Sequence, residues 1–169
     1  MPPDPAPEFS RPLPLGLIGP EGRREVLEAG EAERAALARR FGIPAVESLR
    51  AELLLRPGAD GTVRAEGRLS AAVVQTCVVT LEPVAQQIDE TVALRFLPQG
   101  REPQDEPDET DEIATRNGVA ELGEAIAEQL ALALDPYPRT PDAVLPAGTA
   151  AAAEHPMAEL AKLRGGGSH

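Results

Sequence analysis

One cysteine and two histidines are the side chains in this sequence best suited to nucleophilic or soft-metal chemistry. Cys77 follows Gln75 at the end of an alternating apolar stretch, and it is the only cysteine among 169 residues. Zinc sites need several thiolate or imidazole ligands at fixed spacing, and a thiol becomes a nucleophile beside a base or positive charge. The histidines, His155 and His169, stand far away near the carboxyl terminus. The sequence therefore predicts a buried structural cysteine, with no catalytic residue, metal or cofactor.

Carboxylates offer two further kinds of chemistry, and their spacing supports neither. The acidic cluster over residues 105–112 has the oxygen atoms that hard cations prefer, but Pro107 interrupts it and the Asp-x-Asp-x-Asp-Gly order of a calcium loop is absent. Glu82, Asp89 and Glu90 are candidates for acid–base pairing, yet nothing in the sequence places two of them in one pocket. We interpret the cluster as a solvated loop, whose functional alternative is a tether for a basic protein.

Basic side chains gather in the first half of the chain, where they could meet phosphate groups. No RNP, KH or helix-turn-helix signature accompanies them, acids are interleaved among them, and glycine-rich phosphate-binding motifs are absent from the sequence. A mixed solvated surface is the default interpretation, and a direct RNA-binding module with an arginine-bearing sheet face is the alternative. The arginines concerned are Arg23, Arg24, Arg34, Arg39, Arg40, Arg50, Arg56, Arg64 and Arg68.

The overall composition indicates which partners and compartment to expect. Sixteen basic and 28 acidic residues give a formal net charge of −12, which repels phosphate backbones at long range and favours basic partners. No apolar stretch approaches the ~18 residues of a membrane span, and the sequence does not begin with the pattern of a signal peptide. We therefore expect a cytoplasmic protein that has no membrane partner.

The elements that position these residues are read from hydrophobic periodicity and turn residues. The pattern predicts an α+β fold, in which a curved antiparallel sheet or partly closed β-barrel of about four to six strands packs with two helices. The segments between the elements contain the glycines and prolines typical of turns. Strands are expected over residues 9–15, 23–29, 45–55, 62–77 and 84–97, and helices over 31–41 and 120–133.

The same pattern divides the chain into a folded region and less regular ends. Clustered prolines at the start, and low complexity near the end, cannot form a packed core. Within the tail, residues 157–163 are expected to form at most a short, marginal helix that could act as a docking peptide, and Gly165 to His169 is either a tag remnant or a natural end. The predicted divisions are a flexible leader over 1–8, a domain over 9–140 with a mobile acidic insert at 98–118, and a low-complexity tail over 141–169.

Three landmarks together resemble the YceD family, bacterial proteins named for the accumulation of large-subunit ribosomal RNA. They are a helix at 32–41, the turn Gln-Thr-Cys-Val-Val-Thr-Leu-Glu-Pro-Val at 75–84, and the segment Glu-Gln-Leu-Ala-Leu-Ala-Leu-Asp-Pro-Tyr-Pro-Arg at 128–139. The resemblance extends over about residues 9–140. The candidate family-signature and binding residues are Gln75, Cys77, Thr80, Leu81, Glu82, Pro83, Asp135, Pro136, Tyr137, Pro138 and Arg139.

The resemblance implies a non-catalytic factor that supports accumulation of large-subunit (23S) ribosomal RNA and assembly of the large subunit. Many relatives look like Cys-x-x-Cys-Leu-x-Pro at the turn, whereas Thr80 stands here at the second cysteine position, so a zinc or redox role does not carry over. The acidic charge favours a basic ribosomal protein or a protein–RNA assembly intermediate as partner, with ribosomal RNA itself as an alternative and no small-molecule substrate. A small enzyme, using Cys77 with Glu82 in a pocket, is the hypothesis with least support.

Overall fold

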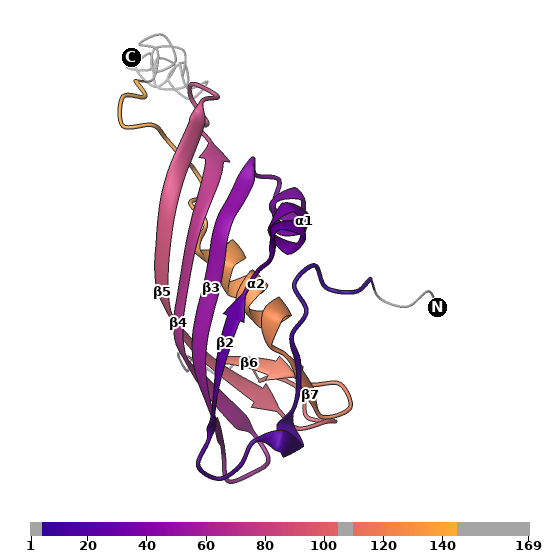
Figure 1. The fold of residues 1–169 in the computed structure, drawn as a ribbon. Coiled ribbons are helices and arrows are strands. Elements are labelled where there is room, and N and C mark those ends of the chain that lie inside the picture. The colour runs from indigo at the N-terminus through magenta and orange to yellow at the C-terminus, as the bar shows by residue number, and fades with distance from the viewer. Residues whose placement is uncertain (1–4, 105–109, 145–169) are drawn as a thin grey trace, which may run out of the picture.

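Three long alternating stretches of the sequence form the centre of one sheet. In this computed structural model, which describes residues 5–104 and 110–144, strands β3 (Ala45–Pro57), β4 (Val63–Thr76) and β5 (Pro83–Leu97) form an antiparallel meander (Figure 1). Successive side chains of a strand point to opposite faces, so the alternating apolar residues of each strand reach one buried face. The predicted meander is confirmed.

Two shorter strands complete the sheet at its edges. β2 (Arg23–Glu28) pairs antiparallel with β3, and β6 (Asp111–Ala114) pairs parallel with β5, which gives the order β2-β3-β4-β5-β6. The fold is α+β, with a mostly antiparallel sheet of five strands. Closing a barrel requires the two edge strands to pair with each other. The described edges, β2 and β6, do not pair, so the sheet is open and the barrel alternative is wrong.

Strand β6 lies inside the segment 98–118, which the sequence pattern indicates to be a loop. Ile113 of β6 packs against the core, and the Thr115 hydroxyl donates a hydrogen bond of 2.6 Å to the carbonyl of Leu97 at the end of β5. A loop is therefore the wrong description of β6, because one apolar side chain and the open edge of β5 suffice for a short parallel strand.

A second sheet of two strands joins distant parts of the chain. β1 (Pro12–Pro14) lies within the edge strand predicted near the amino terminus, precedes the 3-10 helix Leu15–Leu17, and pairs antiparallel with β7 (Val119–Glu121). This pairing keeps the residues of β7 extended. Helix α2 (Leu122–Ala133) therefore begins at Leu122, and not near residue 120 as the periodicity predicts.

Helix α1 (Glu31–Phe41) has the bounds that the sequence predicts, because both of its ends carry local signals. At the start, the Glu33 carboxylate accepts a hydrogen bond of 2.8 Å from the backbone N–H of Gly30. At the end, Gly42 adopts the left-handed conformation, with a φ of 65°, that glycine tolerates best. The fully buried Leu37 anchors the helix to the core, where α1 contacts β3.

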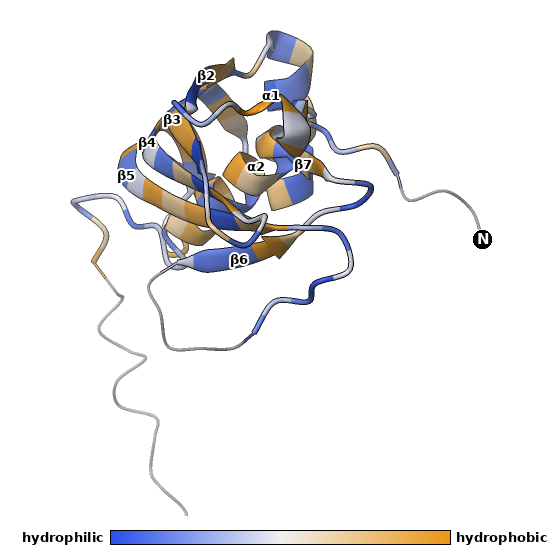
Figure 2. Ribbon diagram, turned by 90° about the horizontal axis from the view of Figure 1, so that it is seen from below, coloured by the Kyte–Doolittle hydropathy of each residue, from blue (hydrophilic) through white to orange (hydrophobic). Residues whose placement is uncertain are grey.

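The strands β2 to β6 curve around helix α2, as Figure 2 shows in a view from below. Leu122, Ile126 and Leu130 of α2 are buried in the core that the sheet surrounds. A Cβ atom at Gly123 would lie only 2.2 Å from the carbonyl oxygen of Phe9, so glycine lets the helix approach the amino-terminal segment closely. Phe9 is itself fully buried, and the core thus includes residues from both halves of the chain.

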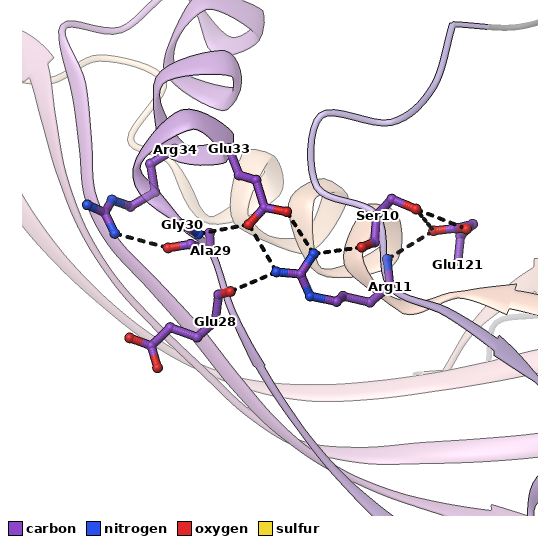
Figure 3. A network of polar contacts seen from close by, with 8 residues as sticks. All are labelled: Ser10, Arg11, Glu28, Ala29, Gly30, Glu33, Arg34 and Glu121. Carbon is purple, nitrogen blue, oxygen red and sulfur yellow. Dashed lines mark hydrogen bonds and ion pairs between the residues drawn. The ribbon is translucent and has the colours of Figure 1, made fainter.

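A network of polar contacts centred on Arg11 fastens the amino-terminal segment to α1 and β2 (Figure 3). The Arg11 guanidinium donates to both carboxylate oxygens of Glu33, at 2.7 and 3.0 Å, and to the backbone carbonyl of Glu28 at 3.0 Å. The hydrogen bonds from Arg11 lower the pKa of Glu33. The Ser10 hydroxyl donates to Glu121 at 3.1 Å, which extends the network to β7.

Several predicted segments fall wholly or partly outside the described residues. These are residues 1–4 of the leader, 105–109 of the acidic insert and 145–169 of the tail, including its predicted helix and terminal residues. Among the residues that the structure describes, no helix is both long enough and apolar enough to cross a membrane.

Candidate binding site at the turn between β4 and β5

The turn between β4 and β5, residues 77–82, is closed by hydrogen bonds between its own backbone groups. The N–H of Cys77 donates to the carbonyl of Glu82 at 2.8 Å, and the N–H of Leu81 donates to the carbonyl of Cys77 at 3.0 Å. Leu81 has a φ of 61°, in the left-handed region that a bulky side chain rarely adopts. Backbone strain of this kind gathers at functional segments, so the turn is a candidate site.

The chain after α2 returns to this turn and is hydrogen-bonded to it. We call residues 135–140 the exit segment. The Pro138 carbonyl accepts a hydrogen bond of 2.9 Å from the N–H of Val78, and the Asp135 carbonyl accepts one of 2.9 Å from the side-chain amide of Gln75. The sequence predicts an extended arm that leaves the domain, whereas these bonds attach the exit segment to the end of β4.

The Cys77 thiol lies where the turn and the exit segment meet. Its sulfur accepts hydrogen bonds from the backbone N–H groups of Thr80, at 3.4 Å, and Thr140, at 3.5 Å. Hydrogen bonds from the Thr80 hydroxyl and from nearby amides lower the pKa of Cys77 to about 6, although desolvation acts in the opposite direction. The residue is completely buried, as predicted, so this arrangement stabilises a thiolate without exposing it.

The lowered pKa has a physical origin that the local sequence reveals only in part. Local sequence around Cys77 contains no basic side chain, and the largest cause is the hydroxyl of Thr80, three residues away. The backbone N–H of Thr140 reaches the sulfur only because the exit segment folds against the turn. Among the described residues, no group of three or more histidine, cysteine or carboxylate side chains could hold a metal ion. Burial and the absence of a neighbouring base favour a structural role for the thiolate.

The outer surface of the site combines apolar and acidic side chains. Leu81 is 76% exposed, Tyr137 is 71% exposed and Val78 is 50% exposed. The hydrogen bond between Val78 and Pro138 places the turn beside the tyrosine-bearing part of the exit segment. Glu82 and Asp135 are also exposed. We call the exposed side chains of residues 77–82 and 135–140 the signature surface.

The structure brings most of the candidate residues into one cluster. Gln75 bonds the exit segment, and Thr80 bonds the Cys77 sulfur. Glu82 closes the turn with Cys77, and Pro83 begins β5. Pro138 is buried against the turn, whereas Pro136 and Arg139 are exposed. Among the residues described, Arg139 forms no ion pair.

Two residues of this cluster were not predicted from the sequence. Thr140 donates its N–H to the Cys77 sulfur, and the Gln86 side chain bonds the Ala133 carbonyl and the Asp135 N–H, each at 3.4 Å. Thr140 directly follows the family-like segment, which is the one local signal that could have indicated it. Gln86 has no such signal, because its role depends on the approach of the exit segment.

The small-enzyme hypothesis needs a pocket that contains Cys77 and Glu82. Four of the surface hollows in the described part of the chain are lined by residues around Arg56, Arg24, Glu8 and Arg34, and none of these four includes Cys77 or Glu82. The thiol is buried and the carboxylate is exposed, so the two do not face a common hollow. This arrangement does not support acid–base or nucleophilic chemistry at the turn.

The nine arginines that could form an RNA-binding sheet face lie on helix α1 as well as on the sheet. Arg34, Arg39 and Arg40 belong to α1, where Arg40 forms ion pairs with Glu8 at 3.0 Å and Glu124 at 2.7 Å. Others project from the sheet. They are Arg23 and Arg24 on β2, Arg50 and Arg56 on β3, and Arg64 and Arg68 on β4.

Comparison with protein families assigns the chain to a class of proteins concerned with ribosomal RNA. The family described as large ribosomal RNA subunit accumulation protein YceD matches residues 65–164, which is more than half of the chain. The chain belongs to the YceD family. The matched range contains the turn and the exit segment, whereas α1 precedes it. Comparisons with the curated proteins and with the solved structures found no match.

Proposed function

We propose that this chain is a non-catalytic cytoplasmic factor in ribosome biogenesis. It supports accumulation of large-subunit (23S) ribosomal RNA and large-subunit assembly by binding a basic ribosomal protein, or a protein–RNA intermediate, through the signature surface. Family membership supports the role in large-subunit RNA accumulation. The observation that supports a binding role most directly is the attachment of the exit segment to the turn, which leaves Leu81 and Tyr137 exposed beside acidic side chains.

The composition of the signature surface favours a basic protein partner. An exposed tyrosine and leucine provide apolar area, and tyrosine is among the residues that contribute most to protein interfaces. The carboxylates of Glu82 and Asp135, with a net charge of −12 for the whole chain, attract a cationic partner and accelerate its encounter. Gln75 donates a hydrogen bond to the Asp135 carbonyl, and Gln86 accepts one from the Asp135 N–H. These bonds hold the exit segment in place before binding, which reduces the entropy lost when the partner docks.

The first test is complementation in the native host. The gene is deleted, and the ratio of large-subunit to small-subunit ribosomal RNA is measured with the intact chain, the double variant Leu81→Asp/Tyr137→Asp, or Leu17→Asp. The intact chain and Leu17→Asp should restore the ratio, because Leu17 is exposed but lies outside the signature surface. The double variant should not restore it. An unchanged ratio after deletion contradicts the proposed role, and full rescue by the double variant contradicts the proposed surface.

The second test measures the partner directly. The purified full chain is titrated against individual large-subunit ribosomal proteins, which differ in their content of lysine and arginine. At least one basic protein should bind, with an affinity about tenfold to a hundredfold lower for Leu81→Asp/Tyr137→Asp, as expected for interface hot spots. Equal binding by this variant and the intact chain would show that the partner uses another surface.

A further inference from the structure

Three arginines stand side by side across the central strands, at the end of the sheet opposite the signature surface. The register pairs Arg56 of β3 with Arg64 of β4, and Arg64 with Arg95 of β5. Directly paired residues on neighbouring strands project from the same face, with Cα atoms about 5 Å apart. We call Arg56, Arg64 and Arg95 the arginine row. On β6, Glu112 stands beside Arg95 at the end of the row.

Other rows on this face place acidic or neutral residues beside each arginine. Glu28 pairs with Arg50, and Glu52 pairs with Arg68. The row next to the arginine row contains Arg24 on β2, Leu54 on β3 and Glu66 on β4, so a neutral residue lies between the arginine and the glutamate. Like charges directly opposite each other destabilise a sheet, whereas opposite charges stabilise it. The arginine row therefore places like charges beside each other where other rows of the sheet do not, and this arrangement does not stabilise the fold.

The arginine row lines a polar hollow of about 630 Å³, which also contains Arg101. The acids in this hollow are Asp60, Glu66, Glu102 and Glu112. Arg101 forms an ion pair with Asp60 at 2.7 Å, Arg95 with Glu112 at 3.2 Å, and Arg64 with Glu66 at 3.7 Å. Within the described parts of the chain, Arg56 makes no ion pair or hydrogen bond.

We propose that the arginine row binds phosphate groups of an RNA backbone. The planar guanidinium donates two parallel hydrogen bonds to phosphate oxygens, which makes arginine well suited to phosphate recognition. A phosphate placed above the row would relieve repulsion between neighbouring arginines. The ion pair of Arg64 with Glu66 is about half exposed on both side chains and contributes little on its own, so a phosphate can replace the carboxylate partner of Arg64.

Charge and geometry define what kind of RNA binding this site supports. The net charge of −12 opposes approach of a polyanion, so binding should be weak and strongly dependent on salt. The row contacts no base edges in this proposal, so binding should also be independent of RNA sequence. The proposal goes beyond the protein-binding role and does not depend on it, because the two surfaces lie at opposite ends of the strands (Figure 1).

The test compares two double variants of the full chain. Arg56→Gln/Arg64→Gln removes two members of the row, whereas the control Arg50→Gln/Arg68→Gln removes two arginines from the same strands and face that are paired with Glu52, at 2.8 Å, and Asp89, at 2.6 Å. A labelled single-stranded oligouridylate is titrated by fluorescence anisotropy at several salt concentrations. Melting temperatures of both variants are measured in the same buffers, and Arg56→Lys serves as a conservative variant that retains the charge.

Arg56→Gln/Arg64→Gln should weaken oligouridylate binding by about tenfold and reduce the slope of log affinity against log salt by about 1.4, since each phosphate contact to a single strand contributes roughly 0.7. The control variant should bind within about twofold of the intact chain, and Arg56→Lys should keep most of the affinity. The row variant should melt no lower than the intact chain, because it loses like-charge repulsion.

Three results would overturn the proposal. The first is no binding of oligouridylate by the intact chain at low salt. The second is an equal loss of affinity in the row variant and the control variant, which would indicate general electrostatic attraction. The third is displacement of the RNA by inorganic phosphate at equal phosphate concentration, which would assign the site to a free phosphate group and not to an RNA backbone.

Discussion

The two ends of strand β4 stabilise negative charge by different means. At the signature surface, neutral hydrogen-bond donors lower the pKa of the buried Cys77 thiol to about 6. In the hollow that the arginine row lines, the guanidinium of Arg101 is the main cause that lowers the pKa of the exposed Asp60 carboxyl to about 2. From Arg64 to Thr76 the strand spans ~40 Å, given a rise of about 3.3 Å per residue.

The difference is consistent with the separate tasks proposed for the two ends. Donors at Cys77 are the Thr80 hydroxyl and the backbone amides of Thr80 and Thr140, and these bonds keep the turn and the exit segment in one arrangement. Charged groups in the hollow that the arginine row lines lie on solvated side chains, whose ion pairs contribute little to stability. A fixed surface suits docking of a protein, and an exchangeable set of cations suits transient contact with phosphates.

The largest expected effect comes from Gly67, which lies on the strand that joins the two ends. A Cβ atom at this position would lie 1.8 Å from the carbonyl oxygen of Glu52 on β3. Gly67→Ala should therefore force the strands apart and lower the free energy of unfolding by about 3 kcal/mol, measured by urea denaturation. Binding at both ends should weaken together.

Gly16→Ala is the matched control for that substitution. Gly16 has open space where a Cβ would be placed, so the change should alter stability by no more than about 0.5 kcal/mol. If Gly67→Ala unfolds at the same urea concentration as the intact chain, then β3 and β4 tolerate a side chain there and the two ends are not coupled through this contact.

A smaller effect, confined to the signature surface, is expected for Gln75→Ala. The substitution removes the hydrogen bond to the Asp135 carbonyl and part of a buried side chain, so stability should fall by about 1 to 2 kcal/mol. The buried Oε1 of Gln75 has no hydrogen-bond partner among the described residues, and its removal offsets part of the loss. Binding of a basic protein should weaken while binding of oligouridylate stays unchanged.

The exposed Gln87 provides a control on the neighbouring strand. Gln87→Ala should change stability by less than about 0.5 kcal/mol and leave both kinds of binding intact. A loss of oligouridylate binding in Gln75→Ala would contradict the separation of the two surfaces.

The third prediction concerns the pH dependence that Cys77 contributes. Its folded pKa of about 6 lies below the roughly 8.5 of an unfolded thiol, so the folded state holds fewer protons between these values. The contribution to stability is therefore complete above about pH 8.5 and is lost as the pH falls through 6. Thr80→Ala should raise the pKa, as measured by ultraviolet absorbance of the thiolate during titration.

Cys77→Ala supplies the reference for this measurement because it has no thiolate to titrate. Its stability should vary less with pH between about 6 and 8.5 than that of the intact chain. An unchanged thiol pKa in Thr80→Ala would mean that the backbone amides alone set the value.

The smallest expected effect is at the opposite end, where Arg101→Gln should raise the pKa of Asp60 from about 2 toward its ordinary value of about 4. The stabilisation from ionised Asp60 is present above about pH 4 and is lost as the pH falls toward 2, so the variant should lose this dependence. Carboxyl chemical shifts measured by nuclear magnetic resonance at successive pH values give the pKa directly.

The dependence of pKa on ionic strength should distinguish the Cys77 thiol from the Asp60 carboxyl. Added salt should move the Asp60 pKa toward its ordinary value, since an exposed charge pair is screened, and should leave the Cys77 pKa nearly unchanged. Arg68→Gln, which removes a guanidinium paired with Asp89, is the control and should not alter Asp60. A Cys77 pKa as sensitive to salt as that of Asp60 would contradict the distinction drawn between the two ends.

Parts of the fold that depend on residues close together in the sequence could be predicted. Helix α1 has its predicted bounds because Glu33 and Gly42 mark its ends locally. The meander follows from period-two alternation along β3, β4 and β5. Strand β6 was missed because it depends on the free edge of β5, which no local pattern announces.

The residues of the candidate site could be predicted from the sequence, but the contacts between them could not. The turn and the exit segment were both identified as family-like, but their contact through Val78 and Pro138 joins parts of the chain 60 residues apart in sequence. The roles of Gln86 and Thr140 follow from that contact and were not predicted.

The α+β class, the central meander, both helices and the residues typical of the YceD family can be read from the chain alone, because they depend on composition, periodicity and local order. The enclosure of Cys77 by the exit segment, and the alignment of Arg56, Arg64 and Arg95 in one row, become apparent only in the folded molecule. Strand register and the docking of distant segments depend on packing summed over the whole core, which no local pattern contains.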